Sequence, residues 1–148
     1  MTPFTRDELL SAPSRFSHRR EIRFQDIDAA GIMFYARFFD LFHDVYAEYL
    51  AANGAPLPAV IREGKWAAPL VHAEADYLAP LRFGDGVEVA LTGGLLEGSR
   101  LQLGYRITRG DGVVSALGQT VHVFVAVATF KKTAPPPEAL AALAPLLG

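Results

Sequence analysis

The sequence predicts an α+β fold in which a five-stranded antiparallel sheet wraps around one long buried helix. Apolar residues recur at helical spacing over residues 34–54, on a stripe too wide for a helix that lies on a surface. Segments with strand-like alternation follow between residues 71 and 129, and short turns join them. Short turns join antiparallel neighbours, so a single sheet must curl to cover a helix that is apolar on most sides.

The first half of the chain carries the helix. Residues 1–17 contain two prolines and scattered charge, and we expect an N-terminal arm that is loose or forms a short helix. Residues 19–24 (RREIRF) alternate as a strand does. Gly54 marks the expected end of the helix, and residues 55–68, rich in Pro and Ala, are expected to be a linker. The helical stripe consists of Phe38, Leu41, Phe42, Val45 and Tyr49, widened by Phe39, Tyr46 and Leu50.

The second half is expected to form most of the sheet. The expected strands are residues 71–77, 87–91, 101–109 and 113–129. Asp111 and Gly112 form the dipeptide that is typical of a tight hairpin before the last strand. That last strand is long, and its valine-rich face predicts sheet-to-sheet pairing with a second subunit. Residues 133–148 are expected to form a C-terminal tail with a short helix after Pro137.

Composition narrows the class of protein. The chain has 148 residues, which predicts one domain over residues 1–148. With a formal net charge of -2, the chain has no excess of basic residues that would bind nucleic acid or attract it to anionic membranes. The absence of cysteine excludes disulfides and thiolate nucleophiles and fits a reducing compartment. The polar N-terminus does not resemble a signal peptide, so we expect a cytoplasmic protein with no nucleic-acid or membrane partner.

Two carboxylates, Asp26 and Asp28, lie where the first strand gives way to the helix. In a structural role, Asp28 would cap the helix N-terminus, where aspartate is favoured and its charge suits the helix dipole. A calcium loop is excluded, because Ala30 occupies a ligand position and Arg37 stands where the closing glutamate belongs. We expect no metal site, and we take Asp26 as structural.

The same position also allows chemistry. A helix N-terminus offers unpaired backbone N–H groups that can polarise a carbonyl and stabilise the oxyanion formed from it. A carboxylate beside them can attack that carbonyl or activate water. Gly31 would let the backbone and a substrate approach closely. These residues by themselves allow both capping and catalysis.

The stretch FQDIDAAGIMFYARFFDLFHDVY, residues 24–46, closely resembles the signature of hotdog-fold acyl-CoA thioesterases, the family of bacterial 4-hydroxybenzoyl-CoA thioesterase. The resemblance extends from about residue 19 to residue 133. It implies that Asp28 is the catalytic carboxylate and that the backbone N–H of Tyr35, on the first helical turn, polarises the thioester carbonyl. It also implies the hotdog fold, a long helix wrapped by an antiparallel sheet.

A second similarity points to the acyl group. PLVHAEADYLAPLRFGD (residues 69–85) and HDVYAEYL (residues 43–50) look like the corresponding segments of 1,4-dihydroxy-2-naphthoyl-CoA thioesterases, which also cleave an aromatic acyl-CoA. Relatives that prefer short aliphatic acyl groups often carry His where this chain has Tyr35, and the hydroxybenzoyl enzyme has Tyr there. The resemblance therefore implies an aromatic acyl-CoA as the substrate.

Other polar side chains are candidates for binding that substrate. His43 lies on the helix among aromatic residues. It is either a histidine of the core or of a subunit contact, or a residue of the acyl pocket that hydrogen-bonds a ring hydroxyl. Lys131 and Lys132 follow the last strand and are expected to meet the phosphates of coenzyme A. Three polar side chains on strands are left outside the site: His72, Glu74 and His122.

The expected function is hydrolysis of an aromatic acyl-CoA to the free acid and CoA, with no metal or organic cofactor. Asp28 acts as nucleophile or as general base, and the sequence leaves both routes open. Hotdog relatives build their sites between subunits, so we expect a homodimer or a dimer of dimers, a homotetramer. The alternatives are a short-chain aliphatic acyl-CoA thioesterase and a non-catalytic acyl-CoA-binding hotdog module.

Overall fold

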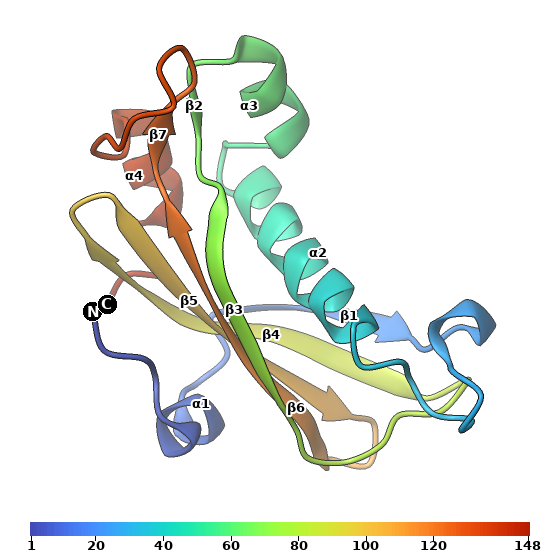
Figure 1. The fold of residues 1–148 in the computed structure, drawn as a ribbon. Coiled ribbons are helices and arrows are strands. Elements are labelled where there is room, and N and C mark those ends of the chain that lie inside the picture. The colour runs from blue at the N-terminus through green and yellow to red at the C-terminus, as the bar shows by residue number, and fades with distance from the viewer.

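The computed structural model describes all 148 residues, and a five-stranded antiparallel sheet forms its centre, in the order β1-β4-β5-β6-β3 (Figure 1). Its strands are β1 (Phe16–Glu21), β3 (Leu70–Tyr77), β4 (Gly86–Glu97), β5 (Arg100–Arg109) and β6 (Val114–Val123). A separate two-stranded ribbon consists of β2 (Trp66–Ala67) and β7 (Val125–Ala126). The helices are α1 (Arg6–Ser11), α2 (Arg37–Ala52), α3 (Leu57–Glu63) and α4 (Pro137–Leu143), with a 3-10 turn η1 (Phe24–Asp26).

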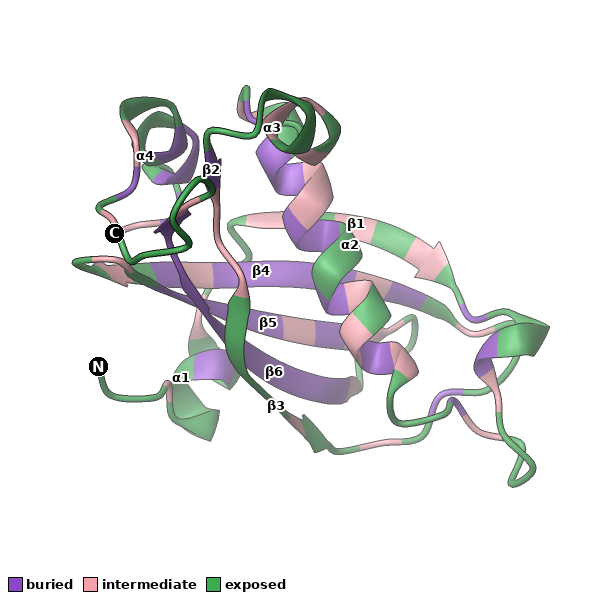
Figure 2. Ribbon diagram, turned by 45° about the horizontal axis from the view of Figure 1, so that its top comes forward, coloured by how far each residue is buried: buried purple, intermediate pink, exposed green.

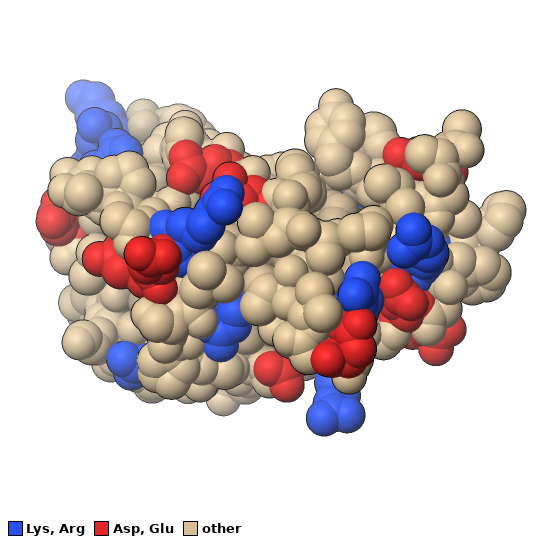
Figure 3. Space-filling model, turned by 90° about the horizontal axis from the view of Figure 1, so that it is seen from below, with Lys and Arg blue, Asp and Glu red and all other residues tan.

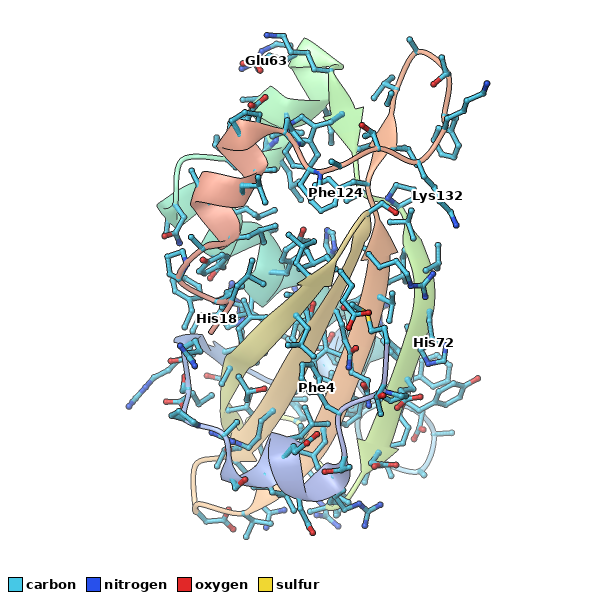
Figure 4. All side chains as sticks on the ribbon, turned by 90° about the vertical axis from the view of Figure 1, so that its left-hand side faces the viewer. Phe4, His18, Glu63, His72, Phe124 and Lys132 are labelled. Atoms are coloured by element: carbon cyan, nitrogen blue, oxygen red, sulfur yellow. The ribbon has the colours of Figure 1, made fainter.

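The helices lie on both faces of the sheet. Helix α2 crosses one face and α1 packs on the other, while α3 and α4 lie at one end (Figures 1 and 2). The close packing of α1 on the sheet depends on Gly104, whose missing Cβ leaves space for Leu9 of α1. Figure 4 shows Phe4 of the N-terminal arm on the same face, where its backbone exchanges hydrogen bonds with the Gln119 side chain. The short helix expected in the arm is thus present, and its capping box at Thr5 and Glu8 explains where it begins.

The central helix is shorter and less enclosed than the sequence predicts. It begins at Arg37 instead of residue 34, and the sheet covers one side of it. Phe38, Phe42 and Val45 are buried, whereas Asp40, His43 and Asp44 are exposed on the opposite side. Figure 2 shows buried and exposed segments alternating along α2. The uncovered side of α2 is polar, so the helix is amphipathic instead of apolar on most sides as expected.

Several expected boundaries were wrong. The first strand is Phe16–Glu21, and residues 24–26 form the 3-10 turn instead of continuing it. The expected linker at residues 55–68 contains α3 and β2. Gly64 ends α3 in the left-handed conformation, with a φ of 64°. Both elements are too short for a periodic pattern to reveal them.

The expected last strand is divided, and it is not at an edge. Strand β6 ends at Val123, and beyond Phe124 the chain changes partner and pairs with β2. Because β6 lies between β5 and β3, its backbone groups are already paired, and the expectation that it pairs with a second subunit is wrong. The edge strands are β1 and β3.

The side chain of Phe42, on α2, packs directly over Gly118 of β6. The ring of Phe42 stacks on that of Tyr105 with centroids 4.9 Å apart, and it occupies the space over Gly118. A Cβ at residue 118 would lie 2.4 Å from Phe42 Cε2. Phe42 is 1% exposed, and its ring packs against those of Phe39 and Tyr105.

Gly118→Ala is therefore expected to lower the free energy of unfolding by about 2–3 kcal/mol, because it overpacks this contact. The measurement is chemical denaturation, and an unchanged m-value confirms that the two variants can be compared as two-state unfolders. Gly86→Ala is the matched control, because a Cβ there meets nothing within 4 Å. Equal stability of the two variants would contradict the close packing of the Phe42 ring on Gly118.

Candidate active site

Asp26 anchors the segment that leads to the helix. Its carboxylate accepts hydrogen bonds from the Arg23 backbone N–H at 2.9 Å and from the Arg23 side chain at 3.3 Å. Its backbone carbonyl accepts from the Phe34 N–H at 2.8 Å. Burial by itself would raise the pKa of Asp26, but the hydrogen bonds and the charge of Arg23 outweigh it and hold that pKa below its ordinary value. Asp26 has the structural role expected of it.

Asp28 points into solvent from a tight turn. Its carboxylate accepts the Ala30 N–H at 2.8 Å, and its backbone pairs with Gly31 and Ile32 across the turn. The capping hypothesis for Asp28 is wrong, because α2 begins only at Arg37 and its N-cap residue is Ala36. Gly31 has a φ of 80°, a conformation that the turn requires and that a side chain would strain. Its expected contact with substrate remains a prediction.

The backbone N–H of Tyr35 is a free donor. Tyr35 precedes α2 instead of lying on its first turn. The Phe34 carbonyl accepts a hydrogen bond from the Arg37 N–H at 2.9 Å, so this carbonyl points toward the helix. The peptide bond between residues 34 and 35 is trans, and its N–H and carbonyl point in opposite directions. The Tyr35 N–H therefore points away from the helix. That N–H has no hydrogen-bond partner in the protein. The next peptide is held by the Tyr77 hydroxyl, which donates to the Tyr35 carbonyl at 2.9 Å.

Asp28 and Tyr35 line one cavity of about 430 Å³ at the N-terminal end of α2. We call it the carboxylate cavity. Its walls are Asp28, Ile32, Met33, Tyr35, Phe38 and residues 77–81. The structure thus brings together an exposed carboxylate and an unpaired N–H donor. A carbonyl group placed between them would meet a nucleophile or base and an oxyanion donor.

His43 lines a different cavity, of about 380 Å³, between α2, α3 and the sheet. We call it the aromatic cavity. Its aromatic lining residues are Phe39, Phe42, Tyr46, Trp66, Tyr105 and Phe130. His43 is exposed at its mouth, while Thr120 and His122 of β6 lie buried in its wall. Sequence reasoning left His122 outside the site, although its interruption of a valine-rich strand was a signal of its position.

A single chain does not unite the predicted site residues. Leu70, at the start of β3, lines the aromatic cavity, and Tyr77, at its end, lines the carboxylate cavity. The two cavities therefore lie at opposite ends of the same edge strand. Lys131 and Lys132 are exposed in the loop after β7, next to Phe130 of the aromatic cavity (Figure 4). Their expected contact with phosphates remains a prediction.

His72 and Glu74, which the sequence left outside the site, line neither cavity. His72 and Glu74 pair at 2.9 Å on the solvated edge strand, and Gln119 also donates to Glu74. Figure 3 shows Lys and Arg mixed with Asp and Glu on the face seen there. No group of three His, Asp or Glu side chains is placed to hold a metal ion. None of the helices has the length and apolar character that crossing a bilayer requires.

Fold and site together define a class, the hotdog proteins with a carboxylate ahead of the central helix. The chain matches the model of the thioesterase-like superfamily over residues 22–143. It belongs to that superfamily. The resemblance drawn from residues 24–46 and the predicted hotdog fold are thereby confirmed.

Two relatives share most of their length with this chain. The 1,4-dihydroxy-2-naphthoyl-CoA hydrolase of Synechocystis sp. is 33% identical over 124 residues, which cover 83% of this chain and 89% of that one. The enzyme of the same name from Synechococcus elongatus is 34% identical over 126 residues, covering 84% and 91%. The crystal structure of the 1,4-dihydroxy-2-naphthoyl-CoA thioesterase from Synechocystis superposes with a TM-score of 0.81 at 30% identity, covering 87% of this chain and 95% of that chain.

Proposed function

We propose that this protein hydrolyses an aromatic acyl-CoA thioester to the free acid and CoA. The observation that carries the proposal is the shared cavity of the Asp28 carboxylate and the free Tyr35 N–H. The relatives named as 1,4-dihydroxy-2-naphthoyl-CoA hydrolases support an aromatic acyl group. The aromatic lining of the second cavity supports it as well, and disfavours the aliphatic alternative.

In the reaction, the thioester carbonyl oxygen accepts a hydrogen bond from the Tyr35 N–H. This hydrogen bond stabilises the negative charge that develops on the oxygen. Asp28 either attacks the carbonyl carbon or takes a proton from an attacking water. In the first route the C–S bond breaks to give CoA thiolate and a mixed anhydride, which water then hydrolyses. In the second, the tetrahedral intermediate expels the thiolate directly. Both routes end in the carboxylic acid and CoA.

A second copy of the chain is needed to complete the site. Strand β3 is an unpaired edge with exposed apolar side chains, and Leu70, Val71 and Tyr77 are 53%, 53% and 46% exposed. In a two-fold dimer, two β3 strands would pair antiparallel, with the Leu70 end of one beside the Tyr77 end of the other. The aromatic cavity of one copy would then face the carboxylate cavity of the second.

This arrangement explains why Asp28 and His43 lie apart in one chain. The acyl group would occupy the aromatic cavity of one copy, while Asp28 and the Tyr35 N–H come from the other. We further propose that Lys131 and Lys132, beside that cavity, contact the phosphates of CoA. The dimer is the minimum assembly, with a homotetramer as the larger form. The absence of cysteine is compatible with the cytoplasmic location expected from the sequence.

The test is a hydrolysis screen that follows release of the CoA thiol. The substrates are the CoA esters of benzoic, hydroxybenzoic, naphthoic, phenylacetic, hexanoic and palmitic acids. We expect higher kcat/KM for the aromatic esters, with hydroxylated rings best. Preference for hexanoyl- or palmitoyl-CoA would overturn the aromatic assignment. Binding of every ester without thiol release would favour a non-catalytic module.

His43→Ala is expected to reduce the preference for hydroxylated over plain aromatic esters and to leave turnover of benzoyl-CoA. A polar side chain in a pocket distinguishes substrates with and without a matching hydroxyl, because a substrate that lacks the hydroxyl leaves the side chain without a hydrogen-bond partner. The measurement is the ratio of kcat/KM for each hydroxylated ester to that for benzoyl-CoA. Asp44→Ala is the control, because Asp44 is the exposed neighbour on α2 and does not line the cavity. An unchanged ratio in His43→Ala would remove His43 from acyl recognition.

A further inference from the structure

The aromatic cavity has a second group of polar side chains, deeper than His43. Tyr46 of α2, Tyr105 of β5, and Thr120 and His122 of β6 all line it. Their exposed fractions are 5%, 1%, 6% and 8%, whereas His43 is exposed at the mouth. Buried polar groups on an otherwise apolar wall carry a desolvation cost unless something hydrogen-bonds to them.

Three of these side chains form a hydrogen-bond chain with a fixed direction. The Ala68 carbonyl can only accept, so His122 Nδ1, 3.1 Å away, carries a proton and donates it. Burial lowers the pKa of His122, which keeps the ring neutral and leaves Nε2 without a proton. Nε2 therefore accepts from the Thr120 hydroxyl at 3.1 Å.

The direction of this chain determines what it offers to a ligand. The Thr120 hydroxyl has one proton, and it donates that proton to His122. In the hydrogen bond of 3.2 Å between Tyr105 Oη and Thr120 Oγ1, Tyr105 is therefore the donor. Every proton in the chain is used. The two hydroxyl oxygens retain free lone pairs, and they can therefore only accept from a molecule in the cavity.

Tyr46 supplies the opposite capacity. Its ring packs against that of His122, with centroids 5.2 Å apart. No hydrogen bond within the protein involves its hydroxyl, and the residue is 5% exposed and lines the cavity. Burial raises the pKa of Tyr46, so the phenol stays protonated and can donate.

We propose that Tyr46 and the Tyr105–Thr120 pair form a hydroxyl-binding subsite at the bottom of the aromatic cavity, which reads a ring hydroxyl that His43 does not reach. A phenolic hydroxyl can accept from Tyr46 and donate to Tyr105 or Thr120. A carboxylate cannot donate, and no cation in this wall would compensate its charge. A plain ring leaves Tyr46 unpaired. The inference rests on the proposed function, because it assigns specificity within the acyl site.

The test compares benzoyl-CoA with its 2-, 3- and 4-hydroxy derivatives. In the wild type, we expect at least one isomer to be preferred over benzoyl-CoA. Tyr46→Phe is expected to reduce that preference roughly five- to tenfold, the effect of one lost hydrogen bond. Tyr105→Phe, which keeps the ring that stacks on Phe42, is expected to reduce the preference for the same isomer.

Tyr49→Phe is the matched control. Tyr49 lies on the same helix, is equally buried, and donates its hydroxyl to the Ala142 carbonyl at 2.6 Å instead of lining the cavity. It should lower the melting temperature and leave the preference unchanged. Tyr46→Phe should not lower the melting temperature, because its hydroxyl has no partner to lose.

The outcomes separate this subsite from the proposed function. If the wild type hydrolyses none of the esters, the proposed function fails. If it hydrolyses them and Tyr46→Phe leaves every ratio unchanged, the subsite is overturned and the thioesterase stands. A loss of melting temperature in Tyr46→Phe that matches Tyr49→Phe, with unchanged ratios, would assign Tyr46 to the core.

Discussion

Asp28→Asn is expected to lower kcat on the best substrate by about a hundredfold or more, because it removes a positioned base or nucleophile. The fold should be kept. The one hydrogen bond of the Asp28 side chain is the bond that its Oδ1 accepts from the Ala30 N–H, and the amide oxygen of asparagine can accept it equally. The measurements are steady-state turnover and the melting temperature of the same preparation. A folded variant with near-wild-type turnover would reduce Asp28 to a turn residue.

Asp26→Asn is the matched control, two residues away. It is expected to keep most of the turnover and to lose about 1 kcal/mol of stability, because the charged hydrogen bonds with Arg23 are lost. The pKa of Asp26 lies below its ordinary value, so this stabilisation is present above about pH 4 and disappears as the pH falls through the folded pKa. Equal losses of turnover in the two variants would contradict a specific role for Asp28.

The second large effect concerns assembly: hydrolytic activity is expected to require a dimer in which the β3 strands of two copies pair. The backbone N–H of Leu78 donates a hydrogen bond to the Ser115 carbonyl of the neighbouring segment. In an antiparallel ladder, successive N–H groups of a strand point alternately toward and away from the partner strand. The N–H of Ala73, an odd number of residues before Leu78, therefore points away from β6. Ala73→Pro removes that outward N–H and spares the ladder to β6. We expect a monomer with at least about a hundredfold lower turnover, since Asp28 would lose the cavity of the second copy. Light scattering at the assay concentration measures the assembly.

Ala73→Val keeps the amide and is expected to remain an active dimer. A sharper test mixes two inactive variants, Asp28→Asn and Val60→Trp, whose new side chain would fill the aromatic cavity. Random exchange of subunits should restore about a quarter of the wild-type sites, because each mixed dimer holds one intact site. Full turnover by a monomer, or a mixture without restored activity, would contradict the shared site.

The local pattern of the sequence was sufficient for much of the architecture. The spacing of Phe38, Phe42 and Val45 predicted α2, and the Asp-Gly hairpin at residues 111–112 predicted the pairing of β5 with β6. Helical periodicity and turn chemistry depend on neighbours in the chain, which is why they can be read without coordinates. The Asp-x-Asp-x-x-Gly segment likewise singled out Asp28 as the candidate carboxylate, and the thioesterase-like superfamily of the chain was confirmed.

Contacts between residues far apart in the sequence decided the rest. Strand β3, with a well-formed alternation, became an edge, while the longer β6 was enclosed by two neighbours. The carboxylate of Asp28 entered a turn well before the helix, and His43 came to line a separate cavity. The buried chain from Tyr105 through Thr120 to His122 joins two strands and the Ala68 carbonyl. The sequence by itself determined the long helix, the strands of the main sheet and which carboxylate to consider. Only the tertiary structure decided which surfaces stay unpaired, because strand order and burial depend on partners that local periodicity does not encode.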